Sequence, residues 1–155
     1  ICAAIYGTSI KQSFKSLISI NLPLPVAFLM KNSELRLIGV FRQEVFVFGS
    51  NLAGHHCGGA ARVARKLFGA KQGQGVGMQG QSYAIPTMQG GVETIKPYVD
   101  EFIEFAKAHP EKRFLVTRIG CGTAGYDASQ IAPLYERAIY VSNIVLPSDF
   151  WGFLM

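Results

Sequence analysis

The sequence predicts an α/β fold, a three-layer α/β/α sandwich in which helices cover both faces of a mostly parallel, mixed sheet. Short apolar runs rich in β-branched and aromatic residues recur along residues 44–146, and longer runs with helical spacing separate them. All but three of the 17 glycines lie between Gly49 and Gly125, and two of them, Gly49 and Gly120, follow a predicted strand directly. In such sheets ligands bind beyond the carboxyl ends of the strands. The glycines therefore fall where a ligand is expected.

Four strands are expected. The first is Glu44–Phe48 (EVFVF), which is β-branched and aromatic and ends at Gly49. The other short apolar runs predict strands at Ser82–Pro86, Phe114–Ile119 and Val141–Leu146.

Three segments between these strands show the apolar spacing of helices: Gly58–Phe68, Val92–His109 and Asp127–Ala138. Gly69 is expected to end the first of them. In the second, Pro97 is compatible only with a place in the first turn. The third begins with Asp127 and Gln130 at the spacing of a capping box.

The glycine-rich segment Lys71–Gln81 (KQGQGVGMQGQ) contains G-x-G-x-x-G at Gly75–Gly80. A strand follows it, not a helix, so the segment does not fit the dinucleotide-binding fingerprint. It is expected to be either a flexible loop that covers a ligand or a surface connection.

Composition narrows the class of protein. The 155 residues suffice for one domain, and the 49% hydrophobic and 16% charged residues exclude a disordered tail, a coiled coil or a charged linker. The net charge of +5 is mild, so an anionic partner is not repelled, while nucleic acid is not an expected partner. Cys2, Cys57 and Cys121 are too scattered for a disulfide framework or a structural zinc site. No metal or cofactor is expected, and the scattered cysteines favour a reducing, cytoplasmic compartment. No run reaches the ~18 consecutive apolar residues of a membrane span, so no membrane association is expected.

The first 29 residues differ from the rest of the chain. They carry two lysines and no acid, and they end in an apolar run that Asn21, Pro23 and Pro25 interrupt, which fits a signal peptide poorly. We expect residues 1–29 to be an N-terminal extension outside the functional unit, or else an ordinary N-terminal element packed on the domain. Residues 30–155 are expected to form a single domain.

Two glycine loops each join a predicted strand to a predicted helix. They are GSNLAGHHCGGAA, Gly49–Ala61, and GCGTAGYD, Gly120–Asp127. Small residues leave backbone N–H groups exposed at the positive end of a helix, which suits a phosphate. Two such loops on neighbouring strand ends can hold a diphosphate from both sides. The alternative is a pair of tight turns without a ligand.

At these loops the chain resembles the macro domain superfamily, whose members bind ADP-ribose. Its first signature, a strand ending in N-A-A-N and then G-G-G-V-A, corresponds to VFGSN and to Cys57-Gly58-Gly59-Ala60-Ala61 at the same spacing. Its second signature, an apolar strand followed by S-x-G-[IV]-[YF]-G, corresponds to FLVTRI followed by GCGTAG. Phe48, Cys57 and Ala124 depart from the family's residues, and IGVFRQ replaces its upstream G-D-[IV]. The chain is therefore similar to a divergent macro-like member over residues 44–146.

The resemblance implies roles for matching positions. Asn51 matches the asparagine that contacts the distal ribose and, in hydrolytic members, helps to position substrate and water. Tyr126 offers a ring for packing against the ribose, or it is a core tyrosine. The residues expected at the ligand are Gly49, Ser50, Asn51, Gly58, Gly59, Ala60, Gly120, Cys121, Gly122, Thr123, Ala124, Gly125 and Tyr126.

Several side chains near the loops are candidates for chemistry. His55 or His56 can protonate a leaving group, and Asn51 and His56 are the catalytic candidates; the alternative is a pair of solvent-exposed histidines. Cys121 at a strand-to-helix turn is a candidate nucleophile, or a small residue packed in a turn. Asp127 is explained by a helix cap. Arg118 precedes the second loop and points either to the site or to solvent.

The sequence thus supports a module that binds ADP-ribose or a related nucleotide diphosphate, with hydrolysis of an ADP-ribosyl adduct as a further step. An ADP-ribosylated macromolecule is then a conceivable partner. Two alternatives remain, a non-catalytic module for another nucleotide or a nucleic-acid end, and a transferase that depends on Cys121. Arg62, Arg65 and Lys66 are expected to form a solvated helix face.

Overall fold

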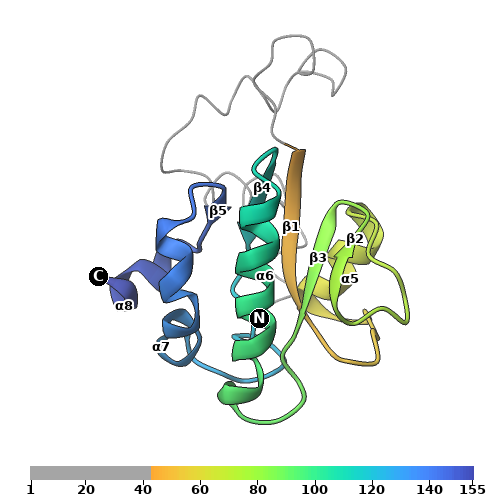
Figure 1. Ribbon diagram of the computed structural model, residues 1–155. Coiled ribbons are helices and arrows are strands. Elements are labelled where there is room, and N and C mark those ends of the chain that lie inside the picture. Colours follow the sequence, from red (N-terminus) through yellow and green to blue (C-terminus); the bar gives the residue numbers. More distant parts are fainter. Residues whose placement is uncertain (1–42) are drawn as a thin grey trace. The chain divides into compact units, whose positions relative to one another are not determined.

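The computed structural model describes residues 43–155, of which residues 44–155 form one compact unit (Figure 1). Five strands form one sheet in the order β2-β3-β1-β4-β5. They are β1 (Gln43–Ser50), β2 (Gly77–Gln79), β3 (Ser82–Pro86), β4 (Lys112–Val116) and β5 (Ile144–Val145). The boundary predicted between residues 29 and 30 lies outside the described residues.

The sheet is mixed and mostly parallel, as the sequence predicts. Strand β1 pairs in parallel with β3, and β4 pairs in parallel with β5, whereas the short β2 runs antiparallel to β3. The parallel pairs follow from the helical connections between them, because a parallel neighbour requires a crossover. Strands β1 and β3 lie where the apolar runs at Glu44–Phe48 and Ser82–Pro86 predict them.

Helices and 3-10 helices fill the connections. The α-helices are α5 (Gly59–Leu67), α6 (Lys96–Ala108), α7 (Ala128–Ile131) and α8 (Trp151–Leu154), and the 3-10 helices are η1 (Val92–Thr94), η2 (Ala132–Tyr140) and η3 (Ser148–Phe150). Pro97 occupies the first turn of α6, where its missing N–H has no helical partner to lose. None of the helices among residues 43–155 combines the length and the apolar character needed to cross a membrane.

Side chains alternate between the two faces of the sheet. Val45 and Val47 of β1 belong to the main core, together with Phe102 and Ile103 of α6, which lies in front of the sheet in Figure 1. Phe46 points to the other face and stacks on Phe68 at the end of α5, with ring centroids 4.6 Å apart. Helices α6 and α5 therefore cover opposite faces, which confirms the α/β sandwich.

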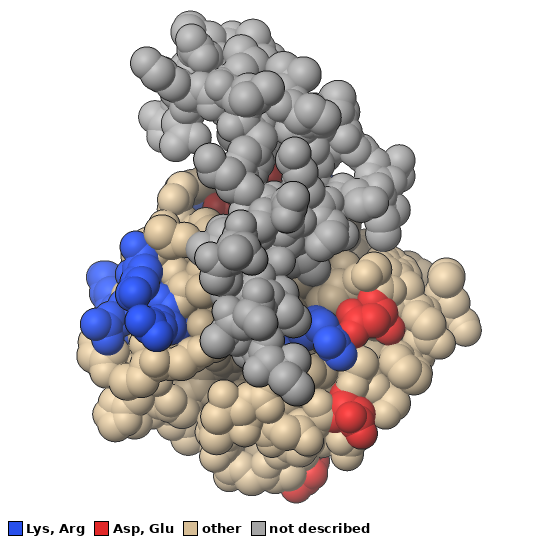
Figure 2. Space-filling view, turned by 180° about the vertical axis from the view of Figure 1, so that it is seen from behind, with Lys and Arg blue, Asp and Glu red and all other residues tan. Residues whose placement is uncertain are grey.

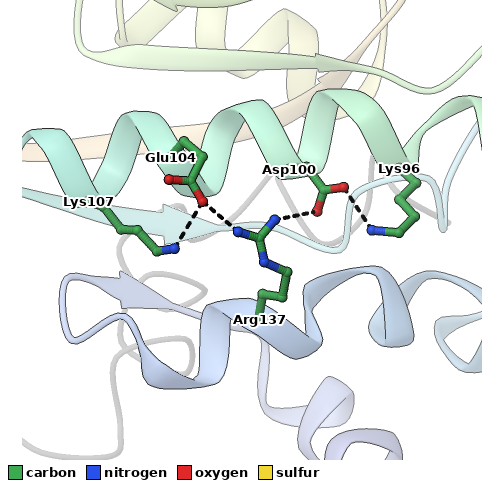
Figure 3. Close-up of polar contacts among 5 residues, drawn as sticks. All are labelled: Lys96, Asp100, Glu104, Lys107 and Arg137. Carbon is green, nitrogen blue, oxygen red and sulfur yellow. Dashed lines mark hydrogen bonds and ion pairs between the residues drawn. The ribbon is translucent and has the colours of Figure 1, made fainter.

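Five exposed or half-exposed side chains join α6 to η2 (Figure 3). Arg137 of η2 lies between Asp100 and Glu104 of α6, with N–O distances of 3.3 and 2.6 Å. Lys96 and Lys107 complete the network at 2.8 and 2.9 Å. These cations, Lys96 and Lys107 first, hold the pKa values of Asp100 and Glu104 below their ordinary range. The network thus joins α6 to η2 through three cations and two carboxylates.

The helix predicted over Asp127–Ala138 differs from the structure. It is the four-residue α7 followed by the 3-10 helix η2. Pro133 explains the change, because it has no N–H to donate to the preceding turn and its ring disfavours a continuous α-helix. The Gln130 side chain accepts a hydrogen bond from the Asp127 N–H at 3.0 Å, as expected for a capping box.

Two predicted strands are shorter than expected. Strand β4 ends at Val116, because the Thr117 hydroxyl turns back and donates to the Val47 carbonyl at 2.8 Å. Strand β5 begins only at Ile144, because the buried Asn143 amide donates to carbonyls of Ala106, His109 and Lys112. Thr117 and Asn143 thus bond to backbone in stretches that the apolar pattern alone predicts to be strand.

Candidate functional site

Three loops meet at the carboxyl ends of the neighbouring strands β3, β1 and β4. We call them the first glycine loop (Gly49–Ala61), the β3 loop (Thr87–Gly91) and the second glycine loop (Gly120–Asp127). An ideal Cβ on Gly49 would lie 3.5 Å from the Gly120 nitrogen and 3.5 Å from the Thr87 hydroxyl oxygen. The Thr87 N–H also donates to the Ser50 carbonyl at 2.9 Å. The two glycine loops therefore touch at this edge of the sheet.

The first glycine loop rests on the segment Lys71–Gln81. A Cβ on Gly75 would lie 2.6 Å from the Leu52 carbonyl oxygen and closer still to that of Asn51, so only glycine allows this backbone contact. The Ser50 hydroxyl donates to the Gly75 carbonyl, and the Gly73 N–H donates to the Gly54 carbonyl at 3.0 Å. Several of the central glycines thus serve contacts between loops.

Neither alternative considered for Lys71–Gln81, a ligand cover or a plain surface connection, describes this packing. The segment contains β2, and the amides of Gln74 and Gln79 bond its backbone internally. The buried Gln79 side chain also accepts from the Lys71 N–H at 2.6 Å. The sequence signal that could have identified this compact loop is the presence of Gln74 and Gln79, because glutamine amides can both donate to and accept from backbone groups.

Asn51 is held inside the first glycine loop. Its side-chain amide donates to the His55 carbonyl at 3.0 Å, and its side-chain oxygen accepts from the His55 N–H at 2.9 Å. Both ends of the amide are therefore engaged with loop backbone, which shapes the turn between β1 and α5. The residue lies at the predicted edge, half-buried, but its amide already has protein partners.

The two histidines differ from each other. His55 is exposed, as expected for a loop histidine, whereas His56 is fully buried, so the expectation of a solvent-exposed histidine is wrong there. The His56 ring lies edge-on to Phe48, and its Nε2 is 2.9 Å from the Gln74 carbonyl, to which it donates. The Nδ1 atom has no hydrogen-bond partner within residues 43–155. His56 thus packs beneath the loop, between β1 and the Lys71–Gln81 segment.

Helix α5 begins at an open N-terminus. Gly58 is its N-cap residue, and no side chain in the described part of the chain caps it. A Cβ on Gly58 or on Gly59 would meet no atom within 4 Å. The first N–H groups of a helix have no partner inside it, and no hydrogen bond within residues 43–155 engages those of Gly59, Ala60 and Ala61. They carry the positive end of the helix dipole.

The second glycine loop presents further N–H groups. Gly120 has a φ of +77° and packs against Ile131, 3.0 Å from where its Cβ would lie, so glycine is required there. Internal bonds use the N–H groups of Cys121, Gly125 and Tyr126. Among residues 43–155, the backbone amides of Gly122, Thr123 and Ala124 have no such partner. Gly122 and Thr123 are exposed, and Ala124 is half-exposed.

Cys121 is half-buried beside this loop. Burial raises the pKa of its thiol, and Asp149 and Asp127 act in the same direction, while Arg118 opposes them. Arg118 itself is paired with Asp149 at 2.7 Å, so it is exposed but not directed at the site as a free cation. A nucleophilic thiolate needs a lowered pKa. The surroundings of Cys121 therefore keep the thiol protonated.

Tyr126 links the second glycine loop to the β3 loop. Its hydroxyl donates to the Gly90 carbonyl, and its ring packs against the main core. Thr87 and Gly90 thus belong to this edge of the sheet, although sequence reasoning missed them. Their signal was their place directly after the predicted strand Ser82–Pro86, where a third loop of the same edge must begin.

The structure therefore brings together the backbone of both glycine loops, while the side chains of Asn51 and His56 are engaged by loop backbone. Among residues 43–155, no three His, Cys, Asp or Glu side chains lie close enough together to hold a metal ion. No family model matches this chain, and neither the curated proteins nor the solved structures yield a match.

Proposed function

We propose that this protein is a macro-like module that binds ADP-ribose or a related nucleotide diphosphate across the two glycine loops. The observation that carries the proposal is the close approach of Gly49 and Gly120, and each of the two loops contains a set of backbone N–H groups without a hydrogen-bond partner among residues 43–155. One set is the open N-terminus of α5, and the other is Gly122–Ala124. A diphosphate accepts hydrogen bonds from both sides, as such a backbone nest offers them.

Charge supports an anionic ligand. No acidic residue occurs between residues 45 and 92, so the first glycine loop, α5, β2 and β3 carry only positive or neutral side chains, and Glu44 is the single acid of β1. On the other side of the site, Asp149 is paired with Arg118. An anion at the start of α5 therefore meets a positive dipole and little repulsion.

Binding is better supported than turnover. Hydrolysis through Asn51 requires its amide to leave two hydrogen bonds to His55. His56 is buried and bonded to Gln74, so proton transfer to a ligand at the loop surface requires the loop to open. The raised pKa of Cys121 argues against a thiolate nucleophile. The proposal is therefore a binding module, with orientation by backbone donors as its only chemistry.

Isothermal titration of the full 155-residue chain with ADP-ribose, ADP and AMP tests the proposal. ADP-ribose and ADP are expected to bind, because each carries a diphosphate, and AMP is expected to bind at least tenfold more weakly. Equal affinity for all three nucleotides, or no heat with any of them in a protein that melts cooperatively, would overturn it.

A further inference from the structure

The cations of α5 gather on its outer side. Arg62, Arg65 and Lys66 are all exposed, and their i, i+3, i+4 spacing places them on one face of the helix. Lys71, four residues after the end of α5, is exposed as well. Figure 2, which views the molecule from behind, shows a group of blue side chains on the left, the side of α5, surrounded by tan atoms. We call these four residues the α5 basic face.

These cations are not paired. None of the four forms an ion pair with an acid of the described residues, and Arg65 contacts only the neutral Gln72 amide, at 3.3 Å. The contrast is the flank of α6, where Lys96, Lys107 and Arg137 all face Asp100 or Glu104. The α5 basic face is thus a local positive patch, because the rest of residues 43–155 carries six lysines and arginines against nine acids.

Helix stability does not account for all of this charge. Arg65 and Lys66 lie in the last turn of α5, where a cation is favourable to the helix dipole. Arg62 is only three residues from the first helical residue, near the positive end, and the first turn contains no acid to balance it. The position of Arg62 is therefore electrostatically unfavourable to the isolated helix, and an anionic partner at this face would offset that cost.

We propose that the α5 basic face binds the phosphate backbone of duplex nucleic acid. Three features favour this occupant. Interfaces with nucleic acid are polar and strongly positive, whereas the centres of protein interfaces are depleted in charge. The exposed aromatic residues of residues 43–155, Tyr140 and Phe153, lie outside α5, so the face offers no platform for stacking unpaired bases. Ala61 and Ala64 on the apolar side of α5 are buried against the protein, and Leu67 is the one exposed large apolar side chain of this helix, so α5 presents no apolar face for insertion into a membrane.

The inference does not rest on the proposed nucleotide site, although both use α5. Backbone contacts carry no sequence information, so binding is expected to be insensitive to base sequence. Each cation that neutralises a phosphate adds about 0.9 to the slope of log affinity against log salt. Four cations predict a contribution of about 3.6, which corresponds to an affinity loss of about 150-fold between about 50 and 200 mM salt.

Fluorescence anisotropy with a labelled 20-base-pair DNA, measured on the full chain across a salt series, tests this inference. The variant Arg62→Gln/Arg65→Gln/Lys66→Gln should bind more weakly and reduce the magnitude of the salt slope by about 2.7. The matched control is Lys96→Gln/Lys107→Gln/Arg137→Gln, which changes the net charge equally but removes paired cations. All variants keep the five cations of residues 1–42, so those contribute equally.

An unchanged slope in the α5 variant, or the same loss in both variants, would overturn the proposal. Tighter binding of single-stranded DNA, of poly-glutamate or of anionic vesicles than of the duplex would also overturn it, because the occupant would then be of another class. Cooperative melting of each variant shows that the fold is intact. Titration with ADP-ribose separates this inference from the proposed function, since the α5 variant keeps the backbone donors of both glycine loops.

Discussion

Replacing Gly58 with Asp should stabilise the fold and abolish nucleotide binding. Gly58 has φ −141° and ψ 166°, which any residue adopts, and a new side chain would meet no atom within 4 Å. An aspartate there can accept hydrogen bonds from the first N–H groups of α5. A few tenths of a kcal/mol come from the better cap, and about 0.3–1 kcal/mol comes from the negative charge near the helix N-terminus. The expected gain in the free energy of unfolding is about 0.5–1 kcal/mol.

The same carboxylate occupies the donors that the diphosphate needs and repels it, so affinity for ADP-ribose should fall at least tenfold, or by about 1.4 kcal/mol. Urea denaturation measures the first effect and calorimetric titration the second. Gly58→Asn is the matched control, because it caps the helix without a charge and should lose less affinity. A Gly58→Asp variant that is more stable and binds ADP-ribose as well as the original chain would refute the assignment of the α5 N-terminus.

Three further outcomes follow from the geometry. Gly75→Ala, whose Cβ would lie 2.6 Å from a backbone carbonyl oxygen, should lower the free energy of unfolding in urea by about 3 kcal/mol or more. Gly77→Ala, whose Cβ would meet no neighbour, should lower it by only about 1–2 kcal/mol because of its positive φ. Equal losses in the two variants would contradict the close approach at Gly75. Burial raises the pKa of Glu44, so its carboxylate lowers stability as pH rises through that raised pKa, and Glu44→Gln should be more stable than the original chain at pH 7 but not below the ordinary value of 4.5. A pH series of denaturation curves checks this, and a pH-independent difference would contradict it. Finally, burial raises the pKa of Cys121, so iodoacetamide should alkylate the exposed Cys57 faster than Cys121. Site-resolved mass spectrometry measures both rates, and a faster reaction at Cys121 would support the hypothesis that Cys121 is a nucleophile.

Much of the sheet could be predicted because its strands are local apolar runs. Strands β1 and β3 lie where EVFVF and SYAIP predict them, and Pro97 falls in the first turn as its missing N–H requires. The predictions that differ depend on single polar or cyclic residues. After Pro133 the last predicted helix continues as the 3-10 helix η2. The buried Asn143 amide bonds loop carbonyls, and the last strand begins only after it, at Ile144. The effect of Pro133 is local and could have been predicted from its missing N–H, whereas that of Asn143 depends on carbonyls 31–37 residues away, which periodicity does not contain.

The candidate site shows the same division. The two glycine loops could be placed at one edge from strand order alone, because parallel strands present their carboxyl ends together. The roles of His56 and Gly75 could not, since both are set by contact with the Lys71–Gln81 segment. A glycine pattern does not distinguish backbone that faces a ligand from backbone that faces another loop. A Cβ on Gly75 would meet the backbone of another loop, whereas one on Gly58 would meet no atom within 4 Å, and only our proposal assigns Gly58 to a ligand.

The central claim is that both glycine loops together hold a diphosphate through backbone donors. Amide chemical shifts of the isotope-labelled full chain, followed by NMR during titration with ADP-ribose, test it most directly. The account predicts large shifts of the Gly59–Ala61 and Gly122–Ala124 amides that saturate together with one dissociation constant. Shifts in only one loop, or shifts confined to residues away from both, would contradict it.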